Sequence, residues 1–123
     1  MVSMAKEVNA SSWEADVEKA KGPVVVDFWQ PECIWCERLA PVYDEVAGDY
    51  DKAGLLSMNI RAEEGNNDLA GGFGIMGTPT MKVFCGGRIV GEIVGFRDQD
   101  GLRRELDHII ADSGDCLAQT SEL

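Results

Sequence analysis

Short apolar runs alternate with amphipathic stretches along most of the chain. Residues 24–29 read Val-Val-Val-Asp-Phe-Trp, and residues 54–60 form a second, largely apolar run. Runs of this length with few polar positions are typical of strands that are buried on both faces. Residues 33–49 and 98–111 instead place apolar side chains three and four positions apart, which predicts two helices.

Glycine and capping signals mark the remaining elements. Two strand-like runs, residues 81–85 and 88–94, are separated only by a Gly-Gly pair, which is a strong hairpin signal. Ser11 and Glu14 have the spacing of a capping box, which predicts a first helix over residues 12–21. A further short helix before the Gly-Gly pair at 71 and 72 is expected to stop there.

The order of these elements defines the fold class. Helices and strands alternate and a hairpin follows, so we expect an α/β protein with a mixed sheet of four or five strands and helices on both faces. A short strand over residues 6–8 would be the fifth. The 123 residues suit one domain, which we place at residues 1–111. Residues 112–123 are small and polar and predict a flexible C-terminal tail.

Composition and charge narrow the choice of partners. Asp and Glu number 22 against 11 Lys and Arg, giving a formal charge of −11. This balance argues against nucleic acid or an anionic membrane as the main partner, because both attract a positive surface. The first ten residues lack the pattern of a signal peptide, and no apolar run is long enough to cross a bilayer. We therefore expect a cytoplasmic protein.

The sharpest chemical signal is Cys33-Ile34-Trp35-Cys36, which follows a predicted buried strand and begins a helix. Cysteines three apart on a helix have neighbouring sulfurs, which can close a disulfide or open to a dithiol. The N–H groups at a helix start favour the Cys33 thiolate, so Cys33 would attack a target disulfide and Cys36 would resolve the product. The alternatives are two inert thiols or half of a zinc site. The remaining cysteines and the single histidine supply no recognisable second half, so no metal is predicted.

Two other positions stand out near this pair. Asp27 lies inside the apolar run of residues 24–29, where burial would raise its pKa and let it exchange a proton with Cys36. A solvated position at a sheet edge is the alternative. Gly77-Thr78-Pro79-Thr80 lies directly before a predicted strand, and from the residues alone the peptide bond before Pro79 is either cis or trans.

Together these motifs resemble the thioredoxin family over residues 8–110. The matching positions are Val26-Asp27-Phe28-Trp29, Cys33, Cys36, Pro41, Gly77-Thr78-Pro79-Thr80 and Gly95. The resemblance implies the thioredoxin fold, with Cys33 as nucleophile, Cys36 as resolving thiol and Asp27 as proton acceptor. It also implies a cis bond before Pro79 and a target groove in which Thr78 offers backbone hydrogen bonds. Trp29, Gly77 and Gly95 would complete that groove.

Departures from the family pattern fall around the cysteines. Glu32 and Glu37 flank the pair where the family usually has an aromatic residue and often a lysine. Their charge disfavours the thiolate and should bias the site against acidic partners. Ile34 and Trp35 replace the usual Gly-Pro and predict an apolar contact patch; the alternative is that they only shield Cys36. Ser57 stands where a lysine commonly faces the buried aspartate, so Asp27 should hold its proton more tightly.

The leading hypothesis is a protein-disulfide reductase that needs no cofactor beyond its cysteine pair. Its partners would be a thioredoxin-reductase-type electron donor and disulfide-containing target proteins, and we expect a monomer. An isomerase or oxidant with a shifted redox potential is the first alternative, and a binding module without turnover is the second. Cys85 and Cys116 have no motif around them and are expected to be incidental free thiols.

Overall fold

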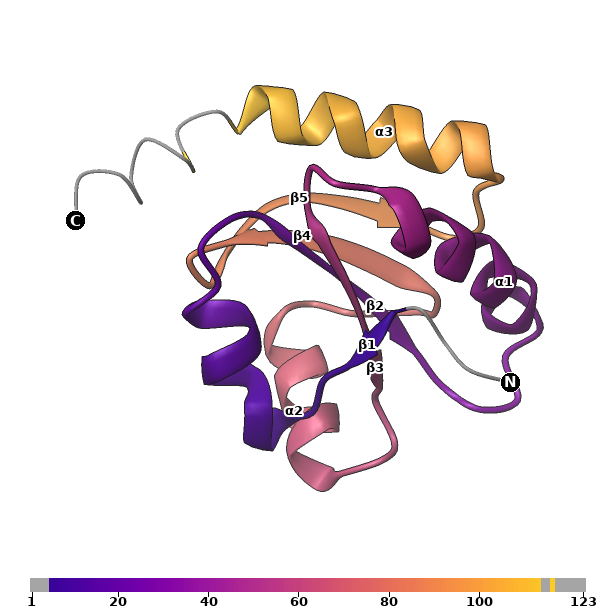
Figure 1. Ribbon diagram of the computed structural model, residues 1–123. Helices are drawn as coiled ribbons and strands as arrows, with labels where there is room; N and C mark the ends of the chain where they lie inside the picture. The colour runs from indigo at the N-terminus through magenta and orange to yellow at the C-terminus, as the bar shows by residue number, and fades with distance from the viewer. Residues whose placement is uncertain (1–4, 114–115, 117–123) are drawn as a thin grey trace.

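The computed structural model describes residues 5–113 and residue 116. Five strands form one sheet in the order β1-β3-β2-β4-β5, with helices on both faces (Figure 1). The elements in chain order are β1 Lys6–Glu7, η1 Ala10–Ser12, η2 Glu14–Glu18, β2 Val24–Trp29, α1 Ile34–Asp49, β3 Gly54–Asn59, α2 Glu64–Gly72, β4 Thr80–Cys85, β5 Arg88–Val94 and α3 Gln99–Asp112. The expected α/β architecture with a mixed sheet is confirmed.

The strand β2 forms the centre of the sheet. It pairs in parallel with β3 and antiparallel with β4, and β4 continues into β5 through the predicted Gly-Gly hairpin. Because alternate side chains of a strand point to opposite faces, Val25 packs under α1 and α3, whereas Val24 and Val26 pack under η2 and α2. Asp27 shares the face of Val25 and therefore points towards α1.

The prediction for the first helix is wrong. The first helix does not run over residues 12–21, because Asn9 rather than Ser11 begins it: the Asn9 N–H donates to Ser12 Oγ at 3.1 Å. The segment then forms a 3₁₀ turn and a short π-helix, and the buried Asn66 side chain holds it by accepting from the Ala10 N–H at 2.6 Å. The helix α2 ends at Gly72, within the Gly-Gly pair that was expected to stop it, and the chain adopts a left-handed conformation shortly afterwards, at Gly74 (φ 77°).

The expectation that Cys85 and Cys116 are free thiols is also wrong, because they form a disulfide with a Cα–Cα distance of 5.7 Å. Cys85 ends β4, and Cys116 lies shortly beyond the end of α3, so the fold brings together cysteines that are 31 positions apart. Both side chains are buried, with 3% and 5% exposed. The rest of the predicted tail lies outside the described residues, apart from Asp112 and Ser113 at the end of α3.

Removing this cross-link is expected to destabilise the protein. A disulfide that closes a loop of this length stabilises a fold by about 3.5 kcal/mol, chiefly by restricting the unfolded chain. A Cys85→Ala/Cys116→Ala variant should therefore melt roughly 10 °C or more below the wild type. Thermal unfolding by circular dichroism without reductant measures this difference. The two single variants should lose as much as the double variant, and additive losses would show that packing rather than the cross-link is responsible.

Candidate functional site

The first pair of cysteines lies where β2 gives way to α1. Cys33 is the N-cap of α1 and forms a disulfide with Cys36, at a Cα–Cα distance of 5.2 Å. The Cys36 backbone N–H donates to Cys33 Sγ at 3.2 Å, so an otherwise unpaired N–H of the first helical turn is directed at this sulfur. Cys33 is half-buried, whereas Cys36 is buried with 5% exposed. A partner therefore reaches Cys33 more easily than Cys36.

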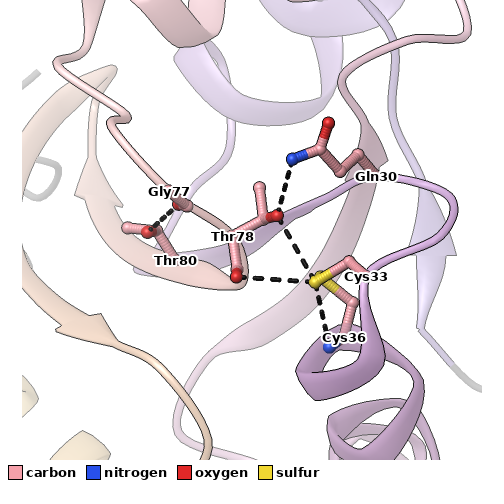
Figure 2. Close-up of a disulfide and its surroundings, with 6 residues drawn as sticks. All are labelled: Gln30, Cys33, Cys36, Gly77, Thr78 and Thr80. Carbon is pink, nitrogen blue, oxygen red and sulfur yellow. Dashed lines mark hydrogen bonds between the residues drawn. A yellow bond between two sulfur atoms is a disulfide. The ribbon is translucent and has the colours of Figure 1, made fainter.

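The loop before β4 supplies the opposite wall of the site. The peptide bond between Thr78 and Pro79 is cis, as the resemblance implies. Cys33 Sγ lies 3.5 Å from the Thr78 carbonyl oxygen, and the Thr78 hydroxyl donates to the same sulfur at 3.4 Å. Gln30 in turn donates through Nε2 to Thr78 Oγ1 at 2.9 Å (Figure 2). Two segments that are far apart in the sequence, the one that carries Gln30 and Cys33 and the loop around Thr78, therefore meet at this site.

Asp27 lies behind the pair, in the centre of the sheet. Its side chain is buried, with 4% exposed, and Oδ1 has no hydrogen-bond partner, so the alternative of a solvated edge position is excluded. Burial first, and then the nearby charge of Asp44, raises the pKa of Asp27 to about 7. Its partner in the register with β3 is Ser57, and no described side chain donates a hydrogen bond to Oδ1.

A cavity of about 310 Å³ connects this carboxyl with Cys36. Asp27 and Cys36 both line it, together with apolar walls that include Trp29 and Ala40. Such a space leaves room for a water molecule between the Asp27 carboxyl and the Cys36 sulfur. The arrangement can therefore carry protons as well as electrons.

The other predicted site residues lie around the pair. Ile34 and Trp35 are 56% and 49% exposed, and the Trp35 ring lies 6.0 Å from that of Phe96. Trp29 lies at the end of β2 and lines the cavity. The Gly95 N–H donates to the Pro79 carbonyl at 2.9 Å, which ties Gly95 to the cis-proline loop.

Charges near the pair are more balanced than the sequence indicates. Arg61 lies 3.9 Å from Glu32, and both side chains are largely exposed. The guanidinium of Arg38 lies 4.9 Å from the centre of the Trp35 ring. These two cations offset part of the negative charge expected from the flanking glutamates.

Gln30, Asp44, Arg61 and the hydroxyl of Thr78 were not identified as functional from the sequence. Asp44 follows Tyr43 on α1, at a helical spacing from Cys36 and Ala40, and this spacing was the one available signal. Gln30 and Arg61 have no signal of this kind, because only the packed fold brings them to the site.

Two searches of the described residues are negative. No group of three or more His, Cys, Asp or Glu side chains that could hold a metal ion occurs within residues 5–113 and 116. Over the same residues, no helix has the length and apolar character needed to cross a membrane.

The fold, the Cys-x-x-Cys pair at a helix start and the adjacent cis-proline loop define a dithiol oxidoreductase. Comparison with known proteins agrees: a model of the thioredoxin family matches residues 4–108. The thioredoxin of Pseudomonas aeruginosa is 40% identical over 101 residues, covering 81% of this chain and 91% of that protein. The thioredoxin of Staphylococcus haemolyticus is 37% identical over 101 residues, with 81% and 92% covered. Thioredoxin 1 of a Nostoc species is 35% identical over 106 residues, with 86% and 97% covered.

The chain belongs to the thioredoxin family. It is a thiol-disulfide oxidoreductase of the protein-disulfide reductase type, and its redox centre is a pair of cysteines. Partners of two general kinds follow from this membership: proteins that contain disulfides, and a reductase that supplies electrons.

Proposed function

We propose that Cys33 is the nucleophile and Cys36 the resolving thiol of a protein-disulfide reductase. The observation that supports this most directly is the difference in access: Cys33 is half-buried at the start of α1, and Cys36 is buried one turn deeper. A thiolate must reach a target sulfur in line with its disulfide, which only the more accessible cysteine can do.

The proposed reaction has two exchange steps. The Cys33 thiolate attacks one sulfur of the target disulfide, a mixed disulfide forms, and the other target sulfur leaves as a thiolate. Cys36 then loses its proton and attacks Cys33 Sγ, which forms the Cys33–Cys36 disulfide and releases the second target thiolate. The target gains two electrons, and the cysteine pair loses them. The two target thiolates take up two protons at neutral pH: one balances the proton that Cys36 loses, and the other comes from solvent, which received the Cys33 proton when that thiol ionised.

Asp27 is the proposed proton acceptor for Cys36. Its support is the shared cavity and the raised pKa of about 7, which lets the carboxyl bind and release a proton at neutral pH. Transfer through one water molecule in the cavity would suffice.

The proposed target groove combines the rim residues. Thr78 offers backbone groups beside Cys33, and Gly77, Pro79 and Gly95 leave space for an extended segment of a target. Trp29, Ile34 and Trp35 supply apolar contact, which the exposure of Ile34 and Trp35 supports.

A disulfide-reduction assay tests the proposed function. With dithiothreitol as electron source, the protein should accelerate the precipitation of insulin that follows reduction of its interchain disulfides. The Cys33→Ser variant should give no more than the rate of dithiothreitol alone. Unchanged acceleration by this variant would rule out Cys33 as the nucleophile.

We also propose that the protein acts as a cytoplasmic monomer, outside any complex with nucleic acid. A cytoplasmic location suits the proposed function, because thiols are kept reduced in that compartment and a catalytic cysteine pair is then held in its dithiol form. The Cys85–Cys116 disulfide argues against it, since structural disulfides are rare in the cytosol. Alkylation of thiols in intact cells decides between these arguments: a Cys33–Cys36 pair that is largely oxidised in the cell would contradict a cytoplasmic reductase.

A further inference from the structure

Hydrogen bonds link two side chains, Gln30 and Thr78, to the sulfur of Cys33. Gln30 follows β2 directly and donates through Nε2 to Thr78 Oγ1 at 2.9 Å; that hydroxyl is 3.4 Å from Cys33 Sγ (Figure 2). Gln30 and Thr78 are both half-buried, so water competes only in part for these bonds. Neither side chain has a part in the exchange steps described above.

The donors and acceptors in these hydrogen bonds are fixed by the chemistry of the groups. A threonine hydroxyl has one proton and two lone pairs. The Gln30 NH₂ group can only donate, so it occupies a lone pair of Thr78 Oγ1 and leaves the hydroxyl proton for another acceptor. Cys33 Sγ is the acceptor that this hydroxyl meets. The amide of Gln30 therefore turns the hydroxyl towards the sulfur.

We propose that Gln30 and Thr78 are positioning residues that hold a hydroxyl proton on Cys33 Sγ and thereby stabilise its thiolate. The inference rests on the proposed role of Cys33 as nucleophile. A disulfide sulfur is a weak acceptor, whereas a thiolate accepts a charge-assisted hydrogen bond, so the bond strengthens when the pair is reduced. The two side chains then favour the reduced, ionised state of the site over the disulfide.

Other groups act on the same sulfur and must be kept constant in any test. The Cys36 N–H is a second donor, at 3.2 Å. The titratable and charged side chains around the pair within the described residues are Asp27, Glu32, Cys36, Glu37, Arg38, Tyr43, Asp44 and Arg61. The segment from Gly77 to Thr80 has no charged side chain, so a neutral substitution at Thr78 leaves the charge of the site unchanged.

Thr78→Val tests the proposal because it replaces the hydroxyl with a methyl group of similar size. Without the charge-assisted bond, the pKa of the Cys33 thiol should rise by about one unit, which means roughly ten-fold less thiolate at a pH below it. The rate at which iodoacetamide alkylates Cys33 in the reduced protein, followed against pH by peptide mass spectrometry, measures this. The equilibrium with glutathione should shift towards the disulfide, because the reduced state has lost a stabilising bond.

Two further variants separate the hydroxyl from the shape of the loop. Thr80→Val removes the next hydroxyl along the chain, at the start of β4, which donates to the Gly77 carbonyl at 2.7 Å rather than to Cys33. It should leave the pKa of Cys33 unchanged; an equal rise would overturn the proposal in favour of loop structure. Gln30→Met should raise the pKa by about half as much as Thr78→Val, and should add nothing in a Thr78→Val background. An independent, additive effect would show that Gln30 does not act through Thr78.

The same data distinguish a failure of this inference from a failure of the proposed function. If Cys36 rather than Cys33 is alkylated first in the wild-type protein, the assignment of the nucleophile is wrong. If Cys33 is alkylated first but Thr78→Val leaves its pKa unchanged, the nucleophile stands and the role of the hydroxyl is overturned.

Discussion

A Cys36→Ser variant is expected to stop at a stable mixed disulfide between Cys33 and its target, with turnover lowered at least about a thousand-fold. In the oxidised protein the two sulfurs are bonded across a Cα–Cα distance of 5.2 Å, so the fold holds Cys36 within reach of Cys33 and no diffusion or large rearrangement need precede its attack on the mixed disulfide. Well-oriented intramolecular groups reach effective concentrations of about 10⁵ M or more, far above the millimolar thiol that would replace Cys36. Resolution therefore becomes the slow step.

Electrophoresis without reductant and mass spectrometry of the trapped species measure this outcome. The matched control is Cys33→Ser/Cys36→Ser, which differs only in the nucleophile and should trap nothing. Turnover by Cys36→Ser near the wild-type rate, with no mixed disulfide, would show that another thiol resolves the intermediate. Cys85 and Cys116 are poor candidates for that role, because they are buried in their own disulfide.

The parts of the fold that depend on local pattern were predictable. The apolar run over Val24–Trp29 and the Gly-Gly pair after Cys85 each reflect interactions between near neighbours, and the sheet formed as expected. The first helix was wrong because its cap depends on Asn66, which is more than fifty positions away in the sequence and accepts from the Ala10 N–H. Pairing of Cys85 with Cys116 is likewise a consequence of where α3 ends over the sheet, which spacing alone does not encode.

The residues of the candidate site likewise fall into those that the sequence predicted and those that it did not. Cys33, Cys36 and Asp27 were predicted because each stands out within a few residues of its own segment. The hydroxyl of Thr78 and the amide of Gln30 can be recognised as part of the site only in the folded protein, where their two loops lie side by side. Neither side chain is unusual within its own stretch of sequence. Side chains that act through a neighbour from another element are the ones that sequence reasoning misses.

Asp27→Asn is expected to stabilise the folded protein by an amount that grows as the pH rises from about 4 to about 7. In the unfolded chain this carboxyl titrates near 3.8, whereas burial and then Asp44 raise its pKa to about 7 in the folded protein. Between these values the folded protein binds a proton that the unfolded chain has released, so the free energy of unfolding falls as pH rises. Below the window both states are protonated and the cost is absent. Above it both are ionised and the cost is complete, at about 4 kcal/mol for a gap of about three units.

An asparagine is neutral at every pH and removes this cost. Urea unfolding at pH 8 should give the variant a free energy of unfolding about 4 kcal/mol higher than the wild type, and the two should be nearly equal at pH 4. An equal gain at both pH values would assign the effect to packing rather than to ionisation. No gain at either would show that the Asp27 carboxylate is not desolvated in the folded protein.

The same substitution should make the folded protein more stable but slow its reaction with the target disulfide. If Asp27 accepts the proton of Cys36, the variant loses about 10²-fold in the rate of resolution and loses the inflection near pH 7 in its pH–rate profile. Asp44→Asn is the matched control: it keeps the acceptor and removes one of the two causes of its raised pKa, so the inflection should move to lower pH without disappearing. A gain in stability joined to a loss of rate would mean that the buried charge is retained for its chemistry, at a cost to the fold. Stability gained without loss of rate would leave Asp27 without a role in proton transfer.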